Sequence, residues 1–131
     1  MTGAGQVRNF CDLHTHTSAS DGQYTPGQLV KLAKERGLSV LAVTDHDTIA
    51  GVGEAMETGA ALGLRVIRGV ELSAREYPNF HILGYGFRGG ETELARLCEM
   101  LRAGRDERKY RIVGFLREMG VDIFDALLNV R

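Results

Sequence analysis

The segment LSVLAVTDHD, residues 38–47, constrains the fold more than any other part of the chain. Residues 39–44 contain a continuous apolar run, which predicts a buried strand. A strand without alternating polar residues is typical of a parallel sheet that is covered on both faces. We therefore expect parallel strands that are joined by helices.

Helical patterns on both sides of this strand support that expectation. The first predicted helix has Thr25 as its N-cap and ends at Gly37. The second is capped by Asp47 or Thr48 and ends at Gly63. Both patterns are short enough to serve as connections between neighbouring strands.

Further strands are predicted at residues 10–16, 64–74 and 80–87. The order β-α-β-α-β-β, with short connections, predicts an α/β fold. From residue 88 to residue 131 the sequence is helical and rich in arginine, with two apolar stripes that indicate a pair of helices. The charges between the stripes are interpreted as a solvated face, with a basic ridge that faces a substrate as the alternative.

The overall charge excludes some functions and leaves others open. With 16 basic and 17 acidic residues, the chain shows no general affinity for nucleic acid or for an anionic membrane. No apolar run is long enough to span a bilayer. Cys11 and Cys98 lack the spacing of a disulfide framework, which is typical of a cytoplasmic protein.

The histidines indicate a metal site. All four lie in or at the ends of predicted strands: His14, His16, His46 and His81. Because side chains alternate along a strand, Asp12, His14 and His16 share one face, and the two imidazoles can chelate one cation. Asp12 could be a further ligand, or could orient an imidazole from behind.

Polar residues at the end of the central strand extend this site. Ligands of α/β sheets bind at the carboxyl ends of the strands, where TDHD follows the apolar run. His46 is the best ligand there, whereas Asp47 is assigned to the helix cap and Asp45 to a supporting position. Asp21 lies in a loop that could fold back over the site, or it could be a turn residue before Gly22.

Glu71 and His81 lie in the last two predicted strands. Glu71 is surrounded by apolar residues, where a carboxylate is costly unless it is paired or binds a metal. Its two oxygens could bridge two cations. The alternative is a salt bridge to Arg68 or Arg75. His81 lies in a strand that we expect to be buried.

Taken together and in order, HTHTSASDG, TDHD, GVELS and HILGY resemble the PHP family, the polymerase and histidinol phosphatase domain. The resemblance covers residues 10–87 closely. It implies the N-terminal part of a distorted (β/α)7 barrel with up to three divalent metals (Mn, Zn or Fe) at the carboxyl ends of its strands. It implies six ligands: His14 and His16 at the first metal, Glu71 bridging the first and second, His81 at the second, and Asp21 and His46 at the third.

The resemblance also implies a reaction. PHP enzymes hydrolyse phosphate esters, with a hydroxide bound to the metals as nucleophile, so no side-chain nucleophile is expected. Arg75, just after Glu71, is a candidate phosphate contact, with a plain surface arginine as the alternative. Residues 88–131 resemble the helical insertion of small bacterial PHP phosphoesterases, which act on nucleotides or on short RNA from its 5′ end.

Two alternatives remain at this stage. One is a histidinol phosphate phosphatase, against which the arginine-rich insertion argues mildly. The other is a non-catalytic PHP module with a metal-binding or structural role. The substrate or partner is accordingly expected to be a phosphorylated small molecule, a nucleotide or a short RNA.

The sequence also predicts an incomplete barrel. No histidine follows His81, whereas the family takes its last ligands from the second half of the barrel. We expect a flexible terminus at residues 1–9, a metal-binding region at 10–87 and a helical insertion at 88–131 that ends within the fold. A C-terminal half would then complete the site, and the isolated chain would be weakly active or inactive.

Overall fold

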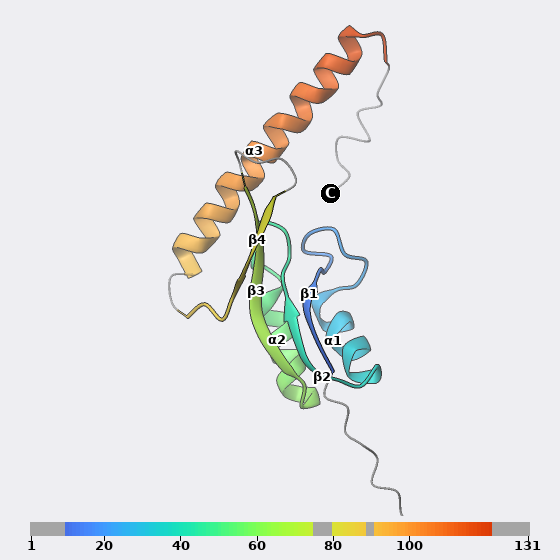
Figure 1. Ribbon diagram of the computed structural model, residues 1–131, viewed down its shortest axis with the longest axis vertical. Coiled ribbons are helices and arrows are strands. Elements are labelled where there is room, and N and C mark those ends of the chain that lie inside the picture. Colours follow the sequence, from blue (N-terminus) through green and yellow to red (C-terminus); the bar gives the residue numbers. More distant parts are fainter. Residues whose placement is uncertain (1–9, 75–79, 89–90, 122–131) are drawn as a thin grey trace, which may run out of the picture.

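A four-stranded sheet forms the centre of the computed structural model, which describes residues 10–74, 80–88 and 91–121. The strands stand in the order β1-β2-β3-β4 (Figure 1). Their bounds are β1 Phe10–Thr15, β2 Leu38–Val43, β3 Arg65–Ser73 and β4 His81–Tyr85. β1, β2 and β3 are parallel, and β4 is antiparallel to β3. The predicted α/β order is therefore confirmed as a partial barrel in which the carboxyl ends of three strands meet at one edge.

Helices α1 (Pro26–Glu35) and α2 (Val52–Leu62) pack side by side against one face of this sheet (Figure 1). The core between them and the sheet consists of Val30, Ala33, Leu41, Val43, Ala55 and Leu64. The expectation of a sheet covered on both faces is wrong at the β1 edge of the described chain. Five of the six β1 residues are exposed, because both connecting helices lie on the same face and an edge strand has only one neighbour.

The start of α1 and the end of α2 agree with the sequence pattern. Thr25 is the N-cap, and its hydroxyl accepts a hydrogen bond from the backbone N–H of Gln28 at 3.3 Å. The Gln28 side chain accepts in return from the backbone N–H of Thr25 at 3.0 Å, which completes a capping box. α2 ends as predicted at Gly63, whose φ of 62° is a left-handed conformation that glycine adopts without strain.

The predicted start of α2 is wrong. The helix begins at Val52 with Gly51 as its N-cap, so neither Asp47 nor Thr48 caps it. Asp47 has a φ of 47°, and its carboxylate is held by Ser73 instead. The sequence could not exclude the cap assignment because an aspartate before an apolar-periodic segment looks the same in both arrangements.

β4 and the segment after it also differ from expectation. β4 was expected to be buried, but Ile82 and Tyr85 are 54% and 44% exposed. The arginine-rich segment forms one helix, α3 (Glu91–Glu118), in place of a pair, and its far end projects beyond the sheet (Figure 1). It is continuous because it contains no proline and its interior glycines are tolerated within a long helix.

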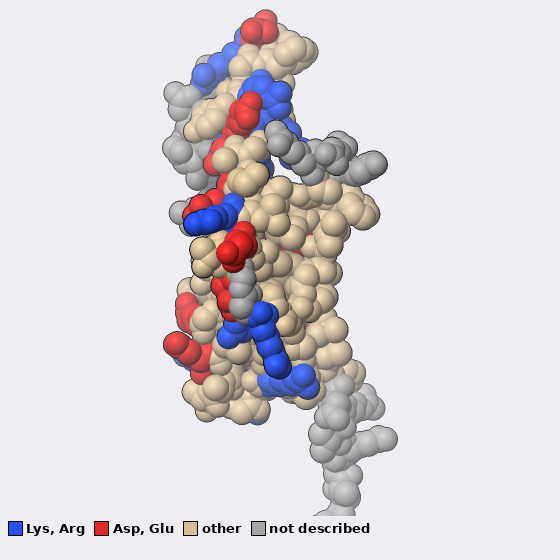
Figure 2. All heavy atoms as spheres, turned by 90° about the vertical axis from the view of Figure 1, so that its left-hand side faces the viewer, with Lys and Arg blue, Asp and Glu red and all other residues tan. Residues whose placement is uncertain are grey.

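Basic and acidic side chains are interspersed on the face that Figure 2 shows. None of the helices that the structure describes is long and apolar enough to cross a membrane.

Candidate metal centre

Backbone pairing between β3 and the segment after β2 places the first polar groups together. His46 forms an isolated parallel bridge with Glu71. The Glu71 N–H donates to the Asp45 carbonyl at 3.1 Å, and the Asp47 N–H donates to the Glu71 carbonyl at 2.8 Å. The relative position of these residues is therefore set by main-chain hydrogen bonds.

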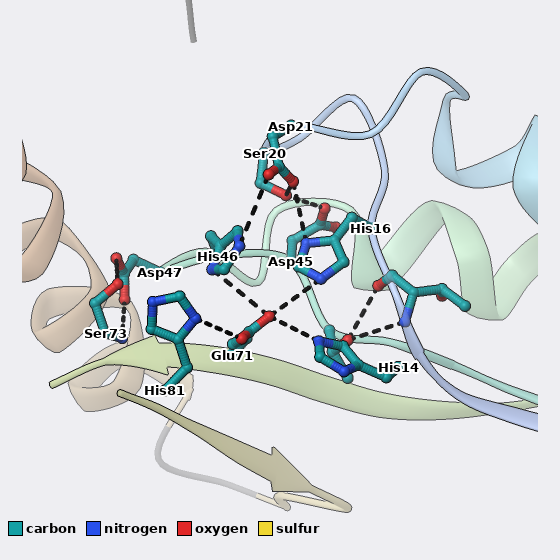
Figure 3. Close-up of polar contacts among 12 residues, drawn as sticks. His14, His16, Ser20, Asp21, Asp45, His46, Asp47, Glu71, Ser73 and His81 are labelled. Atoms are coloured by element: carbon teal, nitrogen blue, oxygen red, sulfur yellow. Dashed lines mark hydrogen bonds and ion pairs between the residues drawn. The ribbon is translucent and has the colours of Figure 1, made fainter. Parts of the chain in front are cut away.

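The Glu71 carboxylate lies at the centre of the four histidines (Figure 3). Its Oε2 lies 2.9 Å from His14 Nε2, 3.1 Å from His16 Nε2 and 3.6 Å from His46 Nδ1. Its Oε1 lies 2.7 Å from His81 Nδ1. Both oxygens thus face imidazole nitrogens, in a side chain that is only 6% exposed.

The sequence offered Arg68 as an alternative partner for Glu71, but Arg68 pairs with Glu91 at 2.8 Å instead. Arg75, the other alternative and the candidate phosphate contact, lies outside the described residues. His81 belongs to the exposed strand β4, and its side chain reaches the centre from there with 37% exposure.

Asp21 folds back over the site from its loop, which is the arrangement expected of a metal ligand and not of a simple turn residue. Its Oδ1 lies 3.1 Å from His16 Nδ1, and its Oδ2 lies 3.7 Å from His46 Nε2. Asp21 is 56% exposed, so it closes the cluster on the solvent side. The structure therefore brings all six candidate ligands together.

The loop that carries Asp21 is fixed from below by Asp45, which is 1% exposed. The Asp45 carboxylate accepts hydrogen bonds from the backbone N–H of Thr17 at 2.7 Å, the Thr17 hydroxyl at 2.8 Å and the Ser20 hydroxyl at 2.6 Å. A Cβ at Gly22 would lie 2.3 Å from the His16 carbonyl oxygen, so the turn requires glycine. Asp45 thus supports the site through the loop.

Asp12 contacts the backbone of β1. Its Oδ1 accepts a hydrogen bond from the His14 N–H at 3.2 Å. The contact constrains β1 where His14 projects, and the Asp12 oxygen does not bond an imidazole in the described part of the chain.

The imidazoles lie close enough to affect one another's protonation. Ring centroids are 5.2 Å apart for His14 and His16, 4.6 Å for His16 and His46, and 4.8 Å for His46 and His81. Burial lowers the pKa of His46, the Glu71 and Asp21 carboxylates oppose this, and His16 and His81 reinforce it. His46 is therefore held in the neutral form that metal binding requires.

The pKa of Glu71 is the result of opposing effects. Burial raises it, but hydrogen bonds from His14 and His81, with the electrostatic influence of the nearby imidazoles, together lower it below its ordinary value. The central carboxylate is therefore ionised near neutral pH, in the state that binds a cation.

Two buried nitrogens indicate that these residues fit a metal. Nδ1 of His16 and Nδ1 of His46 have no hydrogen-bond partner in the described structure, and the 3.1 Å approach of Asp21 to His16 lacks hydrogen-bond geometry. Buried polar atoms are almost always satisfied, so their lone pairs call for a cation. Imidazole and carboxylate together suit zinc, manganese or iron.

The possible ligand atoms form three overlapping groups, within each of which they lie within 4.8 Å of one another. The groups are His14, His16 and Glu71; His16, Asp21 and His46; and His46, Glu71 and His81. Because they share residues, a cation in one group would lie next to a cation in another.

Asp47 has a role that the sequence did not reveal. It is fully buried, and its carboxylate accepts hydrogen bonds from the Ser73 N–H and hydroxyl, both at 2.8 Å. It also pairs with Arg105 of α3, which donates to the Ser73 hydroxyl at 2.9 Å. Its position after a strand end was the only sequence signal, and nothing singled out Arg105 among its neighbours.

A cavity of about 950 Å³ opens beside the cluster. Asp21, His46 and His81 line one side, and residues of α3 line the other. The cluster therefore faces a space large enough for an organic ligand.

Comparison with known proteins places this geometry in context. Residues 12–119 match the family described as PHP domain. The chain is 39% identical to a 5'-3' exoribonuclease of Haemophilus influenzae over 111 residues, and this match covers 84% of the chain and 40% of that protein. It is 36% identical over 120 residues to a 3',5'-nucleoside bisphosphate phosphatase of Chromobacterium violaceum, covering 90% of the chain and 42% of that protein.

A third relative is a phosphoribosyl 1,2-cyclic phosphate 1,2-diphosphodiesterase of Eggerthella lenta, 44% identical over 90 residues that cover 66% of the chain and 34% of that protein. Among solved structures, an amidohydrolase from Chromobacterium violaceum superposes with a TM-score of 0.74 at 35% identity, covering 86% of the chain and 40% of that structure. The chain thus spans less than half the length of the curated relatives it matches.

Proposed function

Because the chain belongs to the PHP domain family, we propose that it hydrolyses phosphate esters with the help of divalent metals and that its substrate is a nucleotide or the 5′ end of a short RNA. The observation that carries the proposal is the cluster around Glu71, in which two buried imidazole nitrogens have no hydrogen-bond partner among the described residues. The names of the exoribonuclease and the bisphosphate phosphatase among the relatives support the substrate class.

We propose six ligands on the basis of this geometry: His14, His16, Asp21, His46, Glu71 and His81. Divalent metals held there would neutralise phosphoryl oxygens and lower the pKa of a bound water. Manganese, zinc and iron all suit the donor set, and the three overlapping groups leave room for up to three ions.

The protein's own contribution is to fix the ligands in the right charge state. Burial keeps His46 neutral, and the hydrogen bonds from His14 and His81 keep Glu71 ionised. Asp45 holds the loop that brings Asp21 over the cluster. His46 and Glu71 are thus already in the charge states that receive a cation, whereas the His14 and His81 nitrogens that donate to Glu71 would exchange those protons for the cation.

We also propose that further polypeptide, equivalent to the C-terminal part of the relatives, completes the site. The chain alone should then bind metal but turn over substrate slowly. A chimera that continues this chain with the C-terminal part of the Haemophilus influenzae relative should regain turnover. As a location we propose the cytoplasm, since Cys11 and Cys98 are both free thiols.

The test combines metal content with hydrolysis. The purified chain and the chimera are loaded with Mn²⁺ or Zn²⁺, desalted and measured by elemental analysis, and phosphate release is measured from a 5′-phosphorylated trinucleotide, adenosine 3′,5′-bisphosphate and histidinol phosphate. His14→Ala and His46→Ala should lower metal content and turnover, whereas Lys31→Ala on α1 is the matched control. Near-zero metal in the unaltered chain contradicts the proposal. Bound metal with no hydrolysis by the chimera favours a non-catalytic module.

A further inference from the structure

An irregularity in β1 lies at the first candidate ligand. Between Asp12 and Thr15 this strand advances three residues while its partner β2 advances two. Leu13 and His14 fall in this stretch and are not among the paired residues of the two strands. An extra residue bends a strand, re-aims the side chains that it carries and disrupts the local ladder. The direction in which His14 projects must therefore be set by other contacts.

Two side chains hold the peptide group that joins Leu13 to His14, one at each polar atom. The Tyr85 hydroxyl donates a hydrogen bond to the Leu13 carbonyl at 2.7 Å. The His14 N–H donates to Asp12 Oδ1 at 3.2 Å. Because a peptide group is planar, contacts at its oxygen and at its nitrogen together fix the orientation of the whole group.

Tyr85 reaches β1 from the opposite edge of the sheet. In a flat sheet β4 and β1 would lie about 14 Å apart, because three strand spacings separate them. The 2.7 Å contact shows that the sheet curls until its two edge strands approach one another. Tyr85 is paired with Gly69 of β3, and directly paired residues point to the same face. The glycine therefore leaves no side chain beside Tyr85 at that position of β3.

His14 depends on this backbone contact more than His16 does. Its side chain is 50% exposed, whereas that of His16 is 21% exposed. The backbone on both sides of His16 is also fixed, because the N–H groups of Thr15 and Thr17 donate to side chains of the segment after β2. Since less packing holds the His14 ring, its 2.9 Å approach to Glu71 depends on the direction of its peptide group.

We propose that Tyr85 is a positioning residue of the metal centre, which acts through the Leu13–His14 peptide. Its hydroxyl and the Asp12 carboxylate hold the two ends of that peptide and direct the His14 ring toward Glu71. The HILGY segment then serves the site twice, through the His81 ring and through the Tyr85 hydroxyl. The inference rests on the proposed function only because the cluster must bind a metal, and it does not require hydrolysis.

The test measures zinc affinity at each histidine separately. The Cε1–H NMR signals of the four imidazoles are assigned from variants in which each histidine in turn is replaced by glutamine. Each signal is then followed as free Zn²⁺ is raised in a chelator buffer. Tyr85→Phe should lower the affinity that the His14 signal reports about three- to tenfold, as expected for the loss of one hydrogen bond. The affinity that the His81 signal reports should change much less.

Variants on the other side of the peptide provide the rescue and the control. Asp12→Ala should weaken zinc binding selectively at His14, whereas Asp12→Asn keeps an acceptor oxygen and should restore most of the affinity. Tyr110→Phe is the matched control, because it removes the same hydroxyl from an exposed tyrosine of α3. Urea denaturation checks that each variant is folded. Equal weakening at His14 and His81 in Tyr85→Phe, or no weakening at His14, overturns the inference.

A measurement without metal separates this inference from the proposed function. In the zinc-free chain, hydrogen exchange of the His14 amide should be about three- to tenfold faster in Tyr85→Phe, because the peptide is no longer held at its oxygen. If the unaltered chain binds no zinc, the proposed function fails, and unchanged exchange of this amide would overturn the positioning role as well. If zinc binding weakens selectively at His14 but the metal-loaded chimera hydrolyses no phosphate ester, the proposed function fails while the positioning role stands.

Discussion

Substitution of Asp47 separates three contributions to the attachment of α3. The carboxylate is fully buried, accepts from Ser73 twice and pairs with Arg105, while its backbone has a φ of 47°. Asn keeps an acceptor and tolerates the left-handed backbone but loses the charge. Ala loses the charge, the acceptor and the backbone tolerance. Gly loses the charge and the acceptor but keeps the backbone tolerance.

The structure gives an order of magnitude for each variant. Asp47→Asn should lower the free energy of unfolding by about 1–2 kcal/mol, discounted because the Arg105 side chain is 42% exposed. Asp47→Ala should cost about 3–4 kcal/mol, since the Ser73 N–H also loses its partner and the left-handed backbone adds about 1 kcal/mol. Asp47→Gly should fall between the two, because only the backbone strain is relieved.

Urea denaturation measures these differences, and hydrogen exchange locates them. Protection of α3 should fall in all three variants, while that of β1 and β2 should change much less. The reasoning is refuted if Asp47→Asn leaves both stability and α3 protection unchanged, or if Ala and Gly are equally destabilising. The first result would show that the ion pair does not hold α3 in place. The second would show that the left-handed backbone of Asp47 does not contribute to the loss of stability.

Three further predictions concern the cluster. Glu71→Gln should lower metal affinity by about tenfold or more in a competition assay with a chelating dye, because the central ligand loses its charge; unchanged affinity would contradict its central position. The pKa of His46 is lowered from 6.5 and that of Glu71 from 4.5, so the folded metal-free chain binds fewer protons than the unfolded one. The stabilising contribution of these two groups should therefore be fully present above about pH 6.5, decline as the pH falls below that value, and decline again below about 4.5. In His46→Gln the decline below about pH 6.5 should flatten. If that decline persists in the variant, a group other than His46 causes it. Gly22→Ala should displace the Asp21 loop and reduce metal content without a matching loss of helix signal, because the added Cβ meets the His16 carbonyl.

Much of the fold follows from local sequence patterns. Strand positions, the start of α1 and the end of α2 are predictable because apolar runs, Thr25 and Gly63 act locally. The start of α2 is not, since Asp47 is engaged by residues far along the chain. The exposure of β4 depends on what covers it in space, which a run of apolar residues does not encode.

For the site, sequence reasoning reaches the residue types but not their arrangement. Histidines at strand ends and a carboxylate in an apolar strand are visible as anomalies, and parallel strands bring them to one edge. From the residues alone Asp21 is better explained as a turn residue, and only the family resemblance makes it a ligand; the Asp45 contacts that hold its loop over the cluster are not visible in the sequence. The side of the cavity that α3 forms depends on the direction of that helix, which two long-range ion pairs help to fix.

The pairing of Glu71 with the segment around His46 has a consequence for folding kinetics. His81 of β4 and His14 of β1 are separated by 81 − 14 = 67 positions in the chain, and the Glu71 carboxylate of β3 contacts both of them. Contacts over such separations form late, because closing long loops must precede them. Metal capture should accordingly report the last assembly step, and added metal should slow unfolding far more than it accelerates folding.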